Sequence, residues 1–153
     1  GDMFAYKEST VAQIPVTEIT NSTLIKPQGR IFYAGNAASF SIDYCTMYGW
    51  GGSKAMLELG DKNTLGMSLA IKNTILANGG SNRKAHNANA AANLSLTIEK
   101  VYGTNDMTFH STLGDVTKYD KPSTEVFENP EEGNFKIIDA LFPSSIGDPR
   151  WTE

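Results

Sequence analysis

The sequence contains very little cysteine. Cys45 is the only one in 153 residues, so no disulfide can form within the chain, and cysteine usage does not indicate a compartment. Residues 43–47 around it are typical of a strand, and they supply no histidine and carboxylate that would activate a thiol. We therefore expect Cys45 to be a buried, unreactive thiol.

Charge is also scarce and is not grouped by sign. Charged residues make up 20 % of the chain, with 13 Lys and Arg against 17 Asp and Glu, a net charge of −4 and a pI of about 5.2. Basic residues are scattered, so we expect no nucleic-acid partner. No apolar run approaches the roughly 20 residues of a transmembrane segment, and no signal segment opens the sequence. Zinc-ligand spacings, a glycine-rich phosphate loop and a nucleophile elbow are missing too.

A repeat of 23 to 28 residues organises the part of the chain that is rich in apolar residues. Residues 51–53 and 79–81 both read Gly-Gly-Ser, 28 positions apart, and Thr46 and Thr74 keep the same spacing. Upstream, Thr23 precedes Thr46 by 23 positions, and residues 3–6 resemble residues 31–34 at an offset of 28. Downstream, residues 94–99 repeat the alternation of residues 69–71 at an offset of 27. Such periods are typical of solenoid proteins.

The hydrophobic pattern within each repeat has the period of a strand. Apolar residues alternate with polar ones, as in Phe40/Ile42, Leu69/Ile71 and Leu96/Ile98. Helical repeats would need a period of 3.6, leucine-rich repeats a regular leucine and asparagine motif, and propeller blades about 40 residues. The sequence therefore predicts an all-β protein, a right-handed parallel β-helix of about four coils, in which stacking buries the apolar rows.

The two ends of the chain differ from the repeat. We expect coils over residues 1–106 and, over residues 107–153, a C-terminal strap and cap of the same domain with Trp151 as an anchor, because prolines and single aromatics replace the repeat there. At the N-terminal coil edge we expect a preceding domain of the same protein or a self-association partner. Residues 81–93 are either a projecting loop or a short helix over residues 84–92.

Several motifs resemble one known group of proteins. These are residues 130–137 (PEEGNFKI), the ending Gly-Asp-Pro-Arg-Trp at residues 147–151, and more loosely the coil motifs at residues 21–24, 45–47 and 73–75. They resemble pectate-lyase-like β-helix proteins from the polysaccharide-utilisation systems of bacteria, many of which have no known function. The resemblance implies an exported protein, periplasmic or on the outer cell surface, whose partner is a polysaccharide or oligosaccharide.

The resemblance leaves the activity open. One expectation is a non-catalytic, polysaccharide-binding portion of a surface protein; the alternative is part of a lyase or hydrolase acting on acidic glycans, with catalytic residues partly outside this chain. An adhesin or trimeric fibre is a third class. Lyases of this group use calcium, but the outward column Asp43, Lys72 and Glu99 offers only two carboxylates, where Ca²⁺ prefers six to eight oxygens. A salt-bridge ladder explains the column better, so we expect no cofactor and no metal site outside the lyase alternative.

Five residues are candidate ligand-binding residues. Aromatic rings pack against sugar rings, and Tyr44, Tyr48 and Trp50 lie at a strand end and the corner that follows. We expect Trp50 to be exposed because glycines flank it. Arg83 and Lys84 lie in the polar insertion, where an arginine can bind a uronate carboxylate through two hydrogen bonds. No catalytic residue is predicted.

Overall fold

The computed structural model describes residues 2–6, 16–35, 38–60, 66–87 and 94–152. The described chain is predominantly β-strand, as the all-β prediction requires. The strands are β1 (Asp2–Tyr6), β2 (Val16–Ile25), β3 (Arg30–Ala34), β4 (Ser39–Tyr48), β5 (Leu57–Leu59), β6 (Met67–Lys72), β7 (Ile75–Ala77), β8 (Leu94–Glu99), β9 (Tyr102–Gly103), β10 (Thr117–Lys118), β11 (Phe127–Asn129) and β12 (Asn134–Ile137). The helices are short: α1 (Ser123–Val126) and the 3₁₀ turns η2 (Ser111–Leu113), η3 (Pro130–Glu132) and η4 (Pro149–Trp151).

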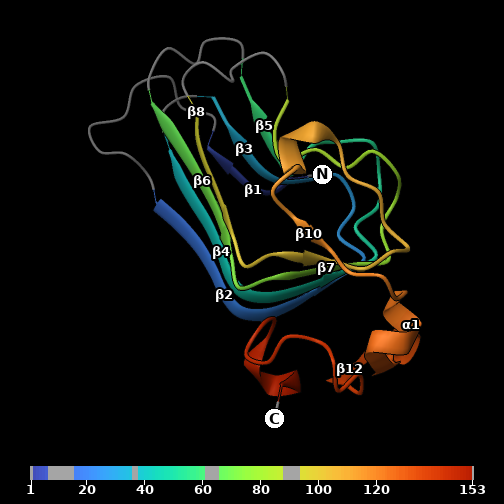
Figure 1. Cartoon of the computed structure of the whole chain (residues 1–153). Helices are drawn as coiled ribbons and strands as arrows, with labels where there is room; N and C mark the ends of the chain where they lie inside the picture. The colour runs from blue at the N-terminus through green and yellow to red at the C-terminus, as the bar shows by residue number, and fades with distance from the viewer. Residues whose placement is uncertain (1, 7–15, 36–37, 61–65, 88–93, 153) are drawn as a thin grey trace.

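Strands that are distant in the sequence pair side by side in parallel (Figure 1). One sheet has the order β1-β3-β5. In the larger sheet β2, β4, β6 and β8 are successive neighbours. The second half of β4 pairs with β7 instead of β6, β7 pairs with β9, and β9 pairs with β10. The small β11–β12 pair is antiparallel. Parallel neighbours need a long connection, which each repeat of the sequence provides.

The register agrees with most of the repeat read from the sequence. Phe4 pairs with Phe32, Thr23 with Thr46 and Leu69 with Leu96, as the offsets of 28, 23 and 27 predict. The match of Thr46 with Thr74 is wrong by one residue, because Thr46 pairs with Ile75. A slip of one residue exchanges the two faces of a strand.

A bend divides the two longest strands. β2 and β4 each run for ten residues and turn sharply in the middle, as Figure 1 shows for β2. At the bend Asn21 has φ +47° and Tyr44 has φ +50°. Asp43, Lys72 and Glu99 pair in register across β4, β6 and β8. In the two repeats after β4, the residues that directly follow Lys72 and Glu99 are again left-handed: Asn73 (φ +42°) and Lys100 (φ +52°). These four left-handed residues form one row along an edge of the stack, which we call the corner row.

The apolar rows face the interior. Strand β6 alternates buried and half-buried residues along its length, and its inward residues Leu69 and Ile71 are fully buried. Aromatic rings stack between repeats, with Phe32 and Phe40 4.5 Å apart between ring centroids. The segment between β9 and β10 covers one end of this core: Leu113 and Val116 are buried in it, and Figure 1 shows the orange turn η2 in front of the stacked strands.

The C-terminal residues 119–152, which we call the strap, lie outside the larger sheet, shown in orange to red at the foot of Figure 1. A second apolar cluster joins the outward side chains of Tyr48, Ile75 and Ala77 to Phe127 and Phe135 of the strap. The strap contacts the sheet at successive repeats, from Tyr102 of β9 to Thr23 of β2. The predicted boundary at residue 106 stays a prediction.

The polar segment after β7 differs from the expected loop or helix. Residues 82–87 run alongside the preceding repeat: the Leu57 amide donates to the Ala85 carbonyl and the Asn87 amide to the Leu57 carbonyl. A helix beginning at Lys84 is therefore wrong for residues 84–87, because their backbone groups pair between repeats. Residues 88–93 lie outside the described residues.

Candidate functional site

The outer face of β2, β4, β6 and β8 carries small polar side chains in register. One row across the strands consists of Val16, Ser39, Ser68 and Ser95, and the Ser39 and Ser68 hydroxyls lie 2.7 Å apart. The next outward row contains Glu18, Ser41, Ala70 and Thr97. Alternation forces this arrangement, because the intervening residues fill the core. The result is a surface of hydroxyl groups beside the corner row.

The outward column predicted from the sequence is present in the register. Asp43 pairs with Lys72, and Lys72 with Glu99. Lys72 Nζ lies 3.5 Å from Glu99 Oε2, whereas Asp43 Oδ1 accepts a hydrogen bond of 2.8 Å from Asn73 Nδ2. The predicted salt-bridge ladder thus consists of one ion pair, Lys72 with Glu99, while Asp43 binds the side-chain amide of Asn73 instead of Lys72. An exposed pair of this kind contributes about 0–1 kcal/mol.

Tyr44 is the aromatic residue of the corner row, in which Lys100 is the other member that is not asparagine. Left-handed backbone costs an ordinary residue about 1–2 kcal/mol, and asparagine tolerates it better than a bulky residue does. Asn21 and Asn73 occupy the neighbouring places in the row, so they suit the turn and Tyr44 does not. Its side chain is 39 % exposed. An aromatic ring is therefore held in solvent, between two amides, at a position where it strains the backbone.

The strap reaches the sheet directly beside the corner row. The Gly147 amide donates to the Asn73 carbonyl (2.8 Å), and the Asp148 amide donates to Thr46 Oγ1 (3.1 Å). Asp148 is fully buried and binds Arg150 through Nε and Nη2, while 64 % of the Arg150 side chain stays exposed. The buried carboxylate thereby fixes an exposed guanidinium near the corner.

Tyr48 lies beneath the strap. Its side chain is fully buried, and its hydroxyl donates to Glu131 Oε1 and accepts from Asn78 Nδ2 at 2.6 Å. Burial and the hydrogen bond to Glu131 raise the pKa of Tyr48. The strap therefore covers Tyr48 and leaves Tyr44 exposed, although both residues belong to β4.

The expectation that Trp50 is exposed is wrong. Its side chain is fully buried in the interior cluster. The flanking glycines mark a close approach of neighbouring repeats: a Cβ on Gly51 would lie 2.4 Å from Gln28 Nε2, and one on Gly49 2.9 Å from Lys26 Cγ. Glycine serves tight packing here, and the indole between the two glycines turns inward.

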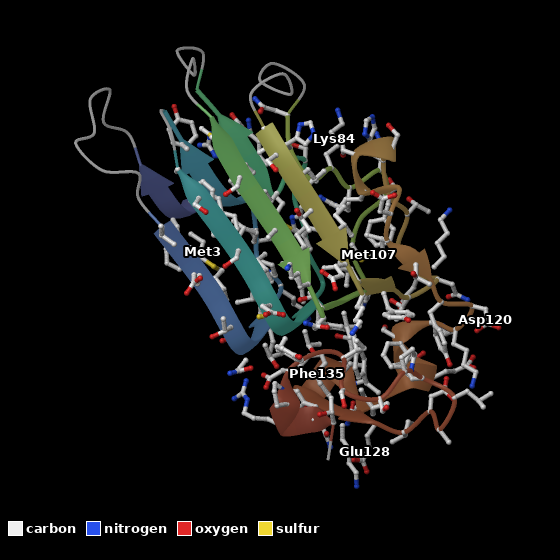
Figure 2. All side chains as sticks on the ribbon, turned by 60° about the vertical axis from the view of Figure 1, so that its left-hand side comes forward. Met3, Lys84, Met107, Asp120, Glu128 and Phe135 are labelled. Carbon is white, nitrogen blue, oxygen red and sulfur yellow. The ribbon has the colours of Figure 1, made fainter. Side chains whose placement is uncertain are left out.

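Arg83 is also buried rather than solvated. Its side chain is 8 % exposed, its Nη1 donates to the carbonyls of Gly51 and Gly52, and its guanidinium carbon lies 5.6 Å from the Trp50 ring centroid. Burial lowers the pKa of Arg83. Lys84 is half-buried at the edge of the molecule (Figure 2). The structure thus brings Arg83 and Trp50 together, inside the stack, and leaves Tyr44 as the exposed aromatic of the predicted set.

Two residues of the corner, Asn21 and Asn73, were missed as candidate site residues. Their signal in the sequence was the coil motif itself, in which asparagine precedes a hydroxyl residue. Among the described residues, no group of three or more His, Cys, Asp or Glu side chains could hold a metal ion. Within the same residues, no helix is long and apolar enough to cross a membrane.

Comparison with known proteins places the chain in a family. A family described as Domain of unknown function (DUF5123) matches residues 40–151, which cover β4 from Phe40 onward and the strap up to Trp151. The chain belongs to the DUF5123 family. No curated protein and no solved structure matches the chain significantly. The first repeat strands β1, β2 and β3 lie before the DUF5123 match, yet eight of the nine residue pairs between β2 and β4 join β2 to residues inside it.

Proposed function

We propose that the chain is a right-handed parallel β-helix, similar to pectate-lyase-like proteins, that binds a polysaccharide on its outer face. Parallel in-register pairing of successive repeats supports the solenoid part of this proposal. The glycan site is the corner row around Tyr44 together with the adjoining hydroxyl rows. Export to the periplasm or the outer cell surface is part of the same proposal, because the resemblance to pectate-lyase-like proteins implies it.

The observation that carries the binding site is the strained and exposed position of Tyr44. Folding would favour an asparagine at φ +50°, the residue that precedes and follows it in the corner row. Backbone strain concentrates where a side chain has a functional task. A ring that is 39 % exposed can pack its face against the CH groups of a pyranose, while the neighbouring amides bind sugar hydroxyls.

Charges around the ring indicate how the ligand is held. Lys72 and Glu99 neutralise each other, and Asp43 is engaged by Asn73. In this proposal, hydrogen bonds from hydroxyls and amides supply the specificity. The serine and threonine side chains of the outward rows extend this surface along several sugar units.

A glycan array tests the proposal, with the full chain applied in the presence and absence of calcium. Tyr44→Asn is the decisive variant, and Tyr44→Phe is its matched control because it keeps the ring. We expect wild type and Tyr44→Phe to bind the same glycans, and Tyr44→Asn to bind them about tenfold more weakly, as for the loss of one packed aromatic ring. Thermal unfolding of Tyr44→Asn should be unchanged or shifted upward, which separates lost binding from lost folding.

Each other outcome has a clear meaning. If Tyr44→Asn bound as tightly as wild type, the binding site would lie outside the corner row. If wild type bound no glycan on the array, glycan binding by these repeats would be contradicted. Release of unsaturated oligosaccharides in the calcium arm would instead indicate the lyase alternative.

A further inference from the structure

Arg83 is the most buried arginine of the chain, and it has no acidic partner among the described residues. The other two arginines each have one: Arg30 Nη1 lies 3.0 Å from Glu58 Oε1, and Arg150 binds the Asp148 carboxylate. Arg83 is 8 % exposed, yet the ion pairs of the described residues do not include it. The two more exposed guanidiniums are thus neutralised within the fold, and the buried one is not.

The fold makes a place for the Arg83 guanidinium without supplying a negative charge. Its Nη1 atom donates to the carbonyls of Gly51 and Gly52, and glycine at position 80 leaves room for Nη2, because a Cβ there would collide with it. Buried charges in proteins are paired or give up their proton. A guanidinium stays protonated at neutral pH, because its pKa lies above about 12. A counter-charge is therefore needed beside Arg83.

Two buried donor atoms indicate where that counter-charge lies. Arg83 Nε and Trp50 Nε1 are the two buried side-chain N or O atoms that have no hydrogen-bond partner among the described residues. They belong to one contact, since the Arg83 guanidinium carbon lies 5.6 Å from the Trp50 ring centroid. Both atoms can only donate, so the partner that satisfies them is an acceptor.

The surroundings select the chemical class of this acceptor. Trp50 is fully buried and belongs to the same apolar cluster as Met56 and Met107. A water molecule needs two to four polar partners, including acceptors for its own hydrogens, and it brings no charge. A carboxylate on a sugar chain cannot follow the indole into the interior. A small monovalent anion matches both the donor atoms and the positive charge.

We propose that a halide ion, chloride in ordinary buffers, binds inside the stack between Arg83 Nε and Trp50 Nε1 and neutralises the guanidinium. The ion joins two repeats, because Trp50 follows β4 and Arg83 follows β7. A ligand that binds only the folded chain stabilises the fold. Chloride is thus a structural ligand, and its site is separate from the outer surface around Tyr44, which is 39 % exposed.

Thermal unfolding in sodium chloride and in sodium gluconate at equal ionic strength tests this proposal, because gluconate is too large for the interior site. At about ten times its Kd, chloride raises the folding constant about tenfold, so the melting temperature should be about 3–5 °C higher than in gluconate. Arg83→Met removes the charge and should abolish this difference. Trp50→Phe keeps an aromatic ring and removes the indole N–H, so it should reduce the difference to about a third.

Trp151→Phe is the matched control. Trp151 Nε1 already donates to Thr23 Oγ1, so this variant should keep the full difference between the two salts even if it melts at a lower temperature. Trp50→Phe decides the test on its own if Arg83→Met does not fold. A crystal grown in sodium bromide locates the ion, since bromide has an anomalous signal and should lie within hydrogen-bond distance of both nitrogen atoms.

A chloride effect that Trp50→Phe reduces and Trp151→Phe keeps, together with a bromide peak beside Arg83, supports the proposal. Equal melting temperatures of wild type in the two salts would overturn it. An effect that Trp50→Phe keeps in full, or that Trp151→Phe reduces equally, would overturn it too, because the halide would then act elsewhere on the chain. Electron density without an anomalous signal between the two nitrogen atoms would assign the position to water and also overturn it.

Discussion

Thr23 and Asp148 are 125 residues apart in the sequence, and the Thr23 hydroxyl donates a hydrogen bond of 2.6 Å to Asp148 Oδ2. The same hydroxyl accepts from Trp151 Nε1 at 2.7 Å. One threonine of β2 thus holds both the buried acid and the final aromatic of the strap. Because β2 precedes the DUF5123 match and the strap ends it, the contact makes the earlier repeat part of the same folded unit.

Removal of the Asp148 carboxylate should loosen the strap. Asp148→Ala leaves the Thr23 hydroxyl and the Arg150 amide without their acceptor, and lost hydrogen bonds at a buried site cost about 1–3 kcal/mol of unfolding free energy. Urea unfolding followed by tryptophan fluorescence measures the change. Asp115→Ala, at an exposed position, is the control and should be neutral. A neutral Asp148→Ala would show that the strap does not depend on this contact.

Acid should destabilise the fold through the carboxylates of the strap. Burial raises the pKa of Asp148, but hydrogen bonds from Arg150 and Thr23 outweigh it and keep the pKa below its usual value. The hydrogen bond from Tyr48 and the proximity of Lys26 lower the pKa of Glu131. Hydrogen bonds also leave the pKa values of two further acids lowered, Asp139 of the strap and Asp106, which precedes the strap and binds Ser123. A lowered folded-state pKa gives stability that is present above the unfolded-state pKa of about 4 and disappears as pH falls through the folded-state values.

The melting temperature should therefore be nearly constant from about pH 8 to pH 5 and decrease below about pH 4. Differential scanning calorimetry across this range provides the measurement. A double variant with Asp148→Asn and Glu131→Gln should show a shallower decrease, mainly through Asp148, because Glu131 is 55 % exposed on its side chain and well screened. An unchanged slope in the double variant would assign the acid sensitivity to other groups.

The sequence predicted the parallel pairing well because the repeat carries it. The rows that contain Phe4, Thr23 and Leu96 follow directly from the spacing, since each apolar row must continue into the next repeat. The predicted match of Thr46 with Thr74 was wrong because the two residues are identical in sequence but differ in surroundings. Thr46 accepts a hydrogen bond from the strap, at Asp148, whereas Thr74 accepts one from the Cys45 amide in the neighbouring repeat. A difference of one residue in loop length cannot be seen in a sequence of similar side chains.

The candidate site was harder to predict than the pairing. Trp50 and Arg83 were expected near solvent because glycine and polar residues surround them, but the glycines allow close packing and the arginine binds backbone carbonyls of the preceding repeat. Burial of a polar residue depends on partners from another repeat, which local composition does not show. The exposure of Tyr44 depends on its left-handed backbone, which becomes visible only when the bend of β4 is known.

Cys45 should be unreactive in the folded protein. Its side chain is fully buried, and burial raises the pKa of the thiol to about 11. The thiolate, which is the reactive form, is therefore scarce at neutral pH and inaccessible. Ellman's reagent at pH 8 should label no thiol in the native chain and one equivalent in guanidinium chloride. Rapid labelling of the native protein would contradict the buried position.

Gly147 should tolerate no side chain. Its φ is +91°, and a Cβ would lie 2.7 Å from Ile75 Cδ1 and 2.9 Å from Thr46 Oγ1. Gly147→Ala must therefore strain the backbone and push the strap away from the sheet, which should cost about 1–3 kcal/mol of unfolding free energy. Gly66→Ala is the matched control, because a Cβ there meets nothing within 4 Å, and it should be neutral or slightly stabilising. Chemical denaturation of both variants decides the matter: equal stability of Gly147→Ala and wild type would mean that the close contact of Gly147 with Ile75 and Thr46 is not needed to hold the strap on the sheet.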